Sequence, residues 1–334
     1  QKHTNTEHKR IFGVSLQKNN VMQVLPIHFA PLQGYTEVFY RNAHAACFGG
    51  VDTYYTPFVR LEKGDFRRRD VRGIEPENNQ VSHLIPQLIA PSFEKAEMIL
   101  NLFIEKGYGE VDINLGCPFP ILAKRHNGSG ILPYPEEVKE LLNLVLKYPE
   151  ISFSIKMRLG WENPDECLHL APIINDLPLR QVTMHPRLGK QQYKGEVNLE
   201  GFSAFQEVCK HPLIYNGDIH SLEDIQRIQK QFPALAGMMI GRGLLANPAL
   251  ALEYKENRIL TADEMREKLH SMHTSVYTQY ASQLEGGDEQ LLNKMKTFWE
   301  YLTPQTDRKL LKAIHKSGSL NKYNQAILAF FNQR

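Results

Sequence analysis

Short apolar runs rich in β-branched residues alternate with segments of helical periodicity between about residue 25 and residue 255. Because strands separated by helical segments form parallel βα units, this alternation predicts an α/β fold with a parallel sheet. The strand-like runs begin near residues 25, 51, 84, 110, 152, 180, 212 and 235. Eight such runs favour a closed TIM-type (β/α) barrel over an open doubly wound sheet, with its chemistry at the carboxyl ends of the strands.

Two segments depart from this alternation. The charged stretch "RLEKGDFRRRDVRGIEPENN" at 60–79 has no helical period, so we expect a long loop there, either solvated or facing a substrate. After about residue 260 the pattern is helical throughout, and it opens with a capping box from Thr261 to Glu264. We therefore expect an N-terminal extension over 1–24, a barrel over 25–258 and a small helical bundle over 259–334.

Composition narrows the class of protein. A chain of 334 residues with 42% apolar residues can bury one large core and a small second domain. Its four cysteines form no C-x-x-C pair and its thirteen histidines show no ligand spacing, so no metal site is expected. No apolar run approaches the length needed to cross a membrane, and no signal peptide is visible. These features favour a soluble cytoplasmic protein without a membrane partner, and no obligate protein partner is evident.

Polar residues recur at the ends of the central predicted strands. Since residues two apart on a strand share a face, the strands present three same-face pairs, joined by Gln87 in the third strand. The pairs are Asp112 with Asn114, Lys156 with Arg158, and His185 with Arg187. Any one of them could be a hydrogen-bonded structural residue of a barrel interior. Their coincidence over several strands favours a polar site at one mouth of the barrel.

The last two strands end in "NGD" at 216–218 and "GRG" at 241–243. In barrels, the loops after the seventh and eighth strands often bind phosphate, and Arg242 can supply a matching cation. A phosphorylated cofactor with a planar polar ring would use both this corner and the polar mouth, and flavin mononucleotide (FMN) fits best. No G-x-G-x-x-G element with a ribose-binding acid is present, so a nicotinamide reductant would have to enter the same open mouth.

A lone cysteine, Cys117, closes the fourth predicted strand and is followed by proline. By itself a cysteine at such a place is more often a small apolar residue than a reactive one. Its neighbours change this interpretation, because "APLQGYT", "PQL", "INLGCP", "NGSGIL", "IKMRLGW", "MHPRLGKQQYKG", "YNGDI" and "MIGRGLLANP" occur in this order. From about residue 28 to its end, the chain resembles the tRNA-dihydrouridine synthases. It departs from their usual pattern at Leu32, where methionine is common, and at Pro186, where glycine is common.

The resemblance implies an FMN-dependent enzyme that reduces specific uridines of tRNA to 5,6-dihydrouridine with NADPH as electron donor. Carried over by position, Cys117 is the catalytic acid, with a thiol that is mostly protonated at neutral pH. Asn114, Arg158 and Arg187 are expected to hold the uracil carbonyl groups. The expected flavin contacts are Pro31, Leu32, Gln33, Gln87, Lys156, His185, Asn216, Gly217, Asp218, Gly241 and Arg242.

Two other functions stay open at this point: a flavin barrel that acts on a free small molecule, such as a dihydropyrimidine or dihydroorotate dehydrogenase, and a non-catalytic RNA-binding protein. The first leaves the basic tail without a role, and the second leaves Cys117 and the phosphate corner without one. The tail over 290–334 carries eight Lys and Arg residues against Glu300 and Asp307. We expect it to contact tRNA phosphates, with Arg67–Arg69 as the other candidate surface.

Overall fold

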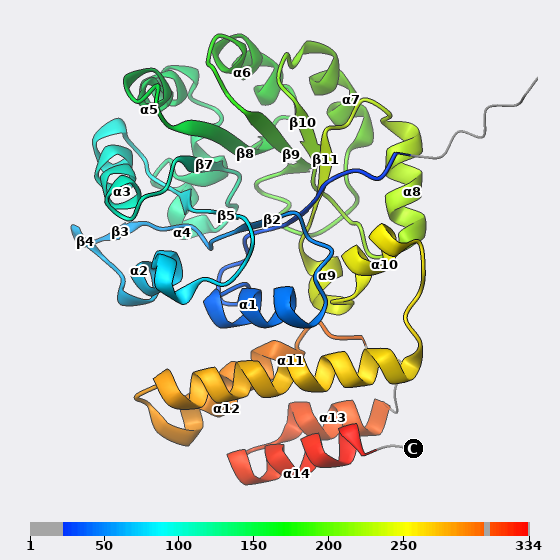
Figure 1. The fold of residues 1–334 in the computed structure, drawn as a ribbon. Helices are drawn as coiled ribbons and strands as arrows, with labels where there is room; N and C mark the ends of the chain where they lie inside the picture. The colour runs from blue at the N-terminus through cyan, green and yellow to red at the C-terminus, as the bar shows by residue number, and fades with distance from the viewer. Residues whose placement is uncertain (1–22, 304–307, 333–334) are drawn as a thin grey trace, which may run out of the picture.

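A computed structural model of the protein describes residues 23–303 and 308–332. The N-terminal extension expected over 1–24 therefore lies almost entirely outside the described residues. Within them, a parallel β-sheet curls into a barrel that is surrounded by helices, and a layer of four further helices packs beneath it (Figure 1). The predicted α/β barrel with a C-terminal helical bundle is confirmed.

The barrel sheet has nine strands in the order β5-β2-β1-β11-β10-β9-β8-β7-β6. Its two end strands, β5 (Leu84–Ile85) and β6 (Gln87–Leu88), are halves of one predicted strand that Pro86 divides, because proline has no N–H to donate to a ladder. The two ends of the sheet thus meet at this residue, and the barrel is nearly closed. The other strands are β1 (Ile27–Phe29), β2 (Thr53–Tyr55), β7 (Glu110–Leu115), β8 (Ser152–Gly160), β9 (Gln181–Leu188), β10 (Leu213–Tyr215) and β11 (Gly237–Ile240).

Amphipathic helices cover the outside of this barrel and bury one face each. In α5 (Pro135–Lys147), for example, Val138, Leu141, Leu142 and Val145 are all buried. The other long helices are α1 (Val38–Cys47), α3 (Phe93–Glu105), α6 (Glu166–Asn175), α7 (Leu199–Val208) and α8 (Leu222–Gln231). Shorter ones follow the strands at the mouth: α4 (Pro120–Ala123), the 3-10 turn η2 (Gly128–Ile131), α9 (Arg242–Ala246) and α10 (Leu250–Glu256).

The expectation of a long irregular loop over 60–79 is wrong. This segment forms a hairpin of β3 (Leu61–Glu62) and β4 (Asp65–Phe66), then α2 (Arg68–Ile74) and the 3-10 turn η1 (Pro76–Asn78). The cause is a tertiary contact: the buried guanidinium of Arg41 in α1 donates to the carbonyl of Gly73 and to Oδ1 of Asn79, at 2.8 and 2.7 Å. Local periodicity cannot reveal a helix that a residue some thirty positions away holds in place.

The four C-terminal helices are α11 (Ala262–Gln283), α12 (Gly287–Trp299), α13 (Arg308–Lys316) and α14 (Leu320–Phe331). The predicted capping box between Thr261 and Glu264 is present at the start of α11. Helix α11 runs alongside α1 of the barrel (Figure 1), and Lys294 of α12 donates to Glu37 at 2.8 Å. No helix within the described ranges is both long and apolar enough to cross a membrane.

Candidate active site

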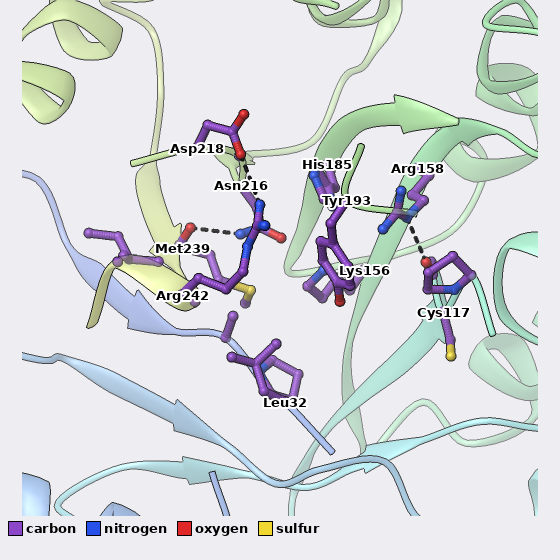
Figure 2. Close-up of a pocket in the computed structure, with 18 of the residues that line it drawn as sticks. Leu32, Cys117, Lys156, Arg158, His185, Tyr193, Asn216, Asp218, Met239 and Arg242 are labelled. Atoms are coloured by element: carbon purple, nitrogen blue, oxygen red, sulfur yellow. Dashed lines mark hydrogen bonds and ion pairs between the residues drawn. The ribbon is translucent and has the colours of Figure 1, made fainter. Parts of the chain in front are cut away.

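A cleft of about 880 Å³ opens at the carboxyl ends of the barrel strands (Figure 2). Figure 2 shows Cys117 and Arg158 on one side, Asn216, Asp218 and Arg242 on the other, and Lys156 and His185 between them. Every flavin contact expected from sequence lines the cleft, with the single exception of Gln87. The cleft is also lined by three residues expected to act on the substrate: Cys117, Asn114 and Arg158. Gln87 and Arg187 are not among the lining residues.

Gln87 lies one layer behind the cleft wall and positions Asn114. It is fully buried, donates to Oδ2 of Asp112 at 2.6 Å and accepts from Nδ2 of Asn114 at 2.8 Å. Ser154 donates to the other oxygen of Asp112 at 2.6 Å, and burial raises the pKa of this carboxyl. Oδ1 of Asn114 then accepts from the backbone N–H groups of Gly116 and Cys117, at 3.0 and 2.8 Å. This chain of buried hydrogen bonds fixes the turn that carries the cysteine.

The side chain of Cys117 is half-buried and packs against Phe58, Ile89 and Leu122. Burial raises the pKa of its thiol, although the nearby charge of Arg158 acts in the opposite direction. The thiol is therefore protonated at neutral pH, as a proton donor must be. The chain folds back over this turn at Gly128, whose φ is +60° and where a Cβ would lie 2.6 Å from the Cys117 carbonyl oxygen. Only glycine fits there.

Two cations project from β8 into the same region, with different environments. Arg158 is 1% exposed and donates to three carbonyls, those of Gly116 at 2.9 Å, Leu188 at 2.9 Å and Gln192 at 2.7 Å. It thus ties the cysteine turn to the loop after β9. The ammonium of Lys156 has no hydrogen-bond acceptor among the described residues, and burial together with Arg158 lowers its pKa to about 8. Lys156 therefore retains its donor capacity for a bound group.

The opposite side of the cleft is organised by an arginine–carboxylate pair. Arg187 is 2% exposed and donates to both oxygens of Asp218, at 2.9 and 2.5 Å, and also to the carbonyl of Gly195. Burial opposes ionisation of Asp218, but its hydrogen bonds with Arg187 and the charge of Arg242 hold the pKa of this carboxyl below its ordinary value. Arg187 therefore holds Asp218 in place in this structure, and its expected contact with substrate stays a prediction.

His185 is a neutral imidazole, because burial and the surrounding cations lower its pKa well below the usual value. Arg187 lies 3.2 Å from its Nε2. Since a guanidinium can only donate, Nε2 accepts and the proton is on Nδ1. No acceptor for this Nδ1–H is found among the residues that the structure describes. The imidazole thus offers a second N–H donor at the cleft, beside the ammonium of Lys156.

The residues present fit a phosphorylated flavin. Arg242 lines the cleft, is only 27% exposed, and pairs with Asp218 at 3.1 Å, so a cation is held at the expected phosphate corner. Gly241 closes the adjacent turn, where a Cβ would lie 3.3 Å from Ala30 and 3.5 Å from Leu32. Lys156 and His185 supply N–H donors for the acceptor atoms of a polar ring. A cation at one end and unsatisfied donors in the middle match a ligand with a phosphate and a polar ring.

Sequence reasoning missed Tyr193, which lies in the loop after β9 and also lines the cleft. Its ring centroid is 4.7 Å from the guanidinium carbon of Arg242 and 5.5 Å from that of Arg158 (Figure 2). A single aromatic residue in the polar stretch 190–196 was the available signal. Its place between two arginines depends on the hydrogen bonds and ion pair that hold Arg158 and Arg242, which the sequence does not show.

Comparison with known proteins identifies one matching family and several similar proteins. The family model described as dihydrouridine synthase (Dus) matches residues 28–332. A tRNA-dihydrouridine synthase B of Pasteurella multocida is 36% identical over 148 residues, which are 44% of each chain. That of Vibrio vulnificus is 27% identical over 74% of this chain and 70% of its own length. A tRNA-dihydrouridine(16) synthase of Haemophilus ducreyi is 28% identical over 69% of this chain and 73% of that protein. Among solved structures, morphinone reductase is 13% identical, with a TM-score of 0.47 over 72% of this chain and 88% of that one.

Proposed function

The chain belongs to the dihydrouridine synthase family, and from that premise we propose that it reduces specific uridines of tRNA to 5,6-dihydrouridine in the cleft of Figure 2. The observation that carries this proposal is the match of one family model to both the barrel and the helical layer. When bound, FMN would supply the hydride for the uracil ring and accept electrons from NADPH. The residues that would hold it are Pro31, Leu32, Gln33, Lys156, His185, Asn216, Gly217, Asp218, Gly241 and Arg242.

Cys117 is the proton donor in this proposal. Hydride addition to one carbon of the uracil double bond leaves the adjacent carbon to receive a proton, and the Sγ–H of Cys117 gives it, leaving a thiolate that solvent reprotonates. The raised pKa of this thiol keeps the proton in place until the ring becomes basic enough to take it. Asn114, which holds the cysteine turn through its Oδ1, also lines the cleft and is a candidate uracil contact.

We also propose NADPH as the electron donor and the cytoplasm as the location of the protein. A nicotinamide must reach the flavin through the open cleft, so NADPH and tRNA use it in turn. Four free cysteines in the described residues support a reducing compartment, and we place the protein in the cytoplasm. The helical layer α11–α14 is proposed to bind tRNA through its exposed lysines.

An assay on the purified protein tests the proposal. We expect yellow protein with the absorption spectrum of FMN, and dihydrouridine at a defined position of transcribed tRNA after incubation with NADPH, detected by mass spectrometry. Free uridine and uracil in parallel reactions test the alternative of a small-molecule reductase, which turns over the free base and leaves tRNA unchanged. Colourless protein that binds no added flavin, or reduction of free uracil without any change in tRNA, would overturn the proposal.

A further inference from the structure

A second cavity adjoins the apolar cluster that packs against Cys117. The two spaces share a wall, because Ile89 and Leu122 line the second cavity and pack against the Cys117 side chain. The floor of the second cavity is apolar, with Leu61, Pro91 and Ile99 as further contributors. The function proposed above assigns no role to this space, although it adjoins the proposed proton donor.

Three cations line this cavity: Arg60, Lys95 and Arg125. Among the described residues, none that lines it is acidic. Arg60 has one ion pair, with the half-exposed Glu62 at 3.4 Å, and its Nε is buried without a hydrogen-bond partner. For Lys95 and Arg125, the described part of the chain places no carboxylate within ion-pair distance. Within the described ranges, three cations that share a single ion pair with a half-exposed carboxylate suit an anionic group such as a phosphate.

The chain that joins Cys117 of the cleft to Leu122 of the second cavity carries exposed apolar side chains. Phe119 and Ile121 follow Cys117 by two and four residues, at the start of α4, and are 55% and 58% exposed. Lys124 and Arg125, at the end of the same helix, are exposed as well. Exposed aromatic residues interleaved with cations are typical of surfaces that bind single-stranded nucleic acid, where bases stack on the rings and phosphates meet the charges.

We propose that Phe119, Arg125 and the cavity lined by Arg60 and Lys95 bind the nucleotide adjacent to the target uridine. The base of this nucleotide stacks on Phe119, and its phosphate is neutralised by the three cations. This inference rests on the proposed function, because the substrate must be an RNA whose target base enters the cleft.

The physical reason is the cost of removing a base from its stack. When the uridine leaves the RNA stack to enter the cleft, its neighbour loses a stacking partner, and the backbone must bend at that point. A platform directly beside Cys117 replaces the lost stacking contact. It also holds the backbone on the side of the cleft from which the proton is delivered, so that the uracil ring is presented to the thiol in a fixed orientation.

The test combines a substitution in the enzyme with removal of a base from the RNA, as in a double-mutant cycle. Phe119→Ala is compared with the native enzyme on intact tRNA and on tRNA with an abasic residue 5′ or 3′ of the mapped dihydrouridine. On intact tRNA we expect kcat/KM to fall about 5- to 150-fold, the range for loss of one stacked base. On one of the two abasic tRNAs the variant and the native enzyme should be equally slow, because the stacked pair is then already absent.

Matched variants separate stacking from local structure. Phe119→Tyr retains an aromatic face and should keep the native kcat/KM, and Leu146→Ala removes an equally exposed apolar side chain on α5 and should have no effect. A double Lys95→Gln, Arg125→Gln variant should flatten the salt dependence of tRNA binding, whereas Lys139→Gln on α5 should not. FMN content and NADPH oxidation are measured for each variant.

Each other outcome overturns the inference. Equal losses for Phe119→Ala on intact and on both abasic tRNAs would mean that Phe119 supports α4 and contacts no base. A raised KM for NADPH with unchanged tRNA kinetics in the double variant would assign the cavity to the dinucleotide. If the native enzyme forms no dihydrouridine at all, the proposed function fails first, and this is visible before any variant is made.

Discussion

The mouth of the barrel and the helical layer beneath it are both rich in arginine and lysine, yet they use these residues differently. At the mouth, Arg158 and Arg187 are 1% and 2% exposed and are held by backbone carbonyls or by Asp218. In the helical layer, Lys312, Lys316 and Lys322 are exposed. A buried charge is held in one geometry and can position reacting groups, whereas an exposed charge contributes a field that attracts phosphate without orienting it.

The buried polar groups of the two regions differ as well. Inside the helical layer, Tyr323 accepts from Nε1 of Trp299 at 2.9 Å and lies 2.6 Å from Nε2 of His273. The hydroxyl of Tyr323 thus joins the indole and the imidazole in one buried hydrogen-bonded cluster. At the mouth, Lys156 and His185 keep donors for which the described residues supply no acceptor. The comparison therefore predicts that changes at the mouth alter chemistry and cofactor binding, while changes on the helical layer alter only RNA affinity.

The largest expected effect is that of Cys117→Ala. Uridine reduction should fall about 10²- to 10⁴-fold, as for a lost general acid, while reduction of the flavin by NADPH continues at the native rate because that step needs no thiol. Stopped-flow absorbance measures the first half-reaction and mass spectrometry of tRNA the second. Cys209→Ala, at another half-buried thiol remote from the cleft, serves as the control. Full dihydrouridine formation by Cys117→Ala would return this residue to a packing role.

Arg242→Ala should weaken flavin retention by about 1.5–3 kcal/mol, the range for a lost charge-assisted hydrogen bond. Equilibrium dialysis against free FMN gives the dissociation constant. Arg227→Ala, which removes an exposed arginine of α8 paired with Asp224, should retain the flavin as the native protein does. If Arg242→Ala and Arg227→Ala bind FMN with equal affinity, the phosphate lies elsewhere. The cations at the mouth would then not differ from exposed cations in cofactor binding.

Lys156→Met should stabilise the flavin-free protein while weakening its affinity for flavin. The pKa of Lys156 is about 8 when folded, against about 10.4 when unfolded, so the charged amine costs stability below pH 8. The cost disappears as pH rises from 8 to 10.4, because the folded state releases its proton first. We expect a gain of about 1–2 kcal/mol in the free energy of unfolding at pH 7 and a smaller gain at pH 9.5. Urea denaturation at both values measures it, and an equal gain at both would contradict the assignment.

The smallest effect per residue is expected on the helical layer. Replacing Lys312, Lys316 and Lys322 together by glutamine should weaken tRNA binding severalfold and reduce the slope of log affinity against log salt by about 0.7–0.9 per lost phosphate contact. Flavin content and NADPH oxidation should stay native. A control triple removes the same charge from the outside of the barrel, at Lys139 of α5, Lys230 of α8 and Lys210 in the loop after α7. If both triples shift the slope equally, only net charge matters, and the helical layer has no special place in RNA binding.

The sequence by itself determined the type of fold and most of the cleft. The alternation of strand and helix patterns was sufficient to predict the barrel. The spacing of residues on one strand face was sufficient to predict that Asn114, Lys156 and His185 lie at one mouth of it. The capping box at Thr261 was readable because it depends on residues three apart. All of these features rest on short-range geometry, in which side-chain direction follows from the backbone period.

Only the tertiary structure decided which polar residues reach the cleft and which stand behind it. Gln87 and Arg187 share the pattern of their neighbours, yet they are bound to Asn114 and Asp218 and do not line the space. The register between β8 and β9 shifts between Arg158 and Gly160, which changes how the two strands align at the mouth. The helix α2 and the position of Tyr193 likewise depend on buried arginines distant in sequence. The burial of a polar side chain and its hydrogen-bond partners are set by contacts between elements. The hydrophobic periodicity of one segment does not predict them.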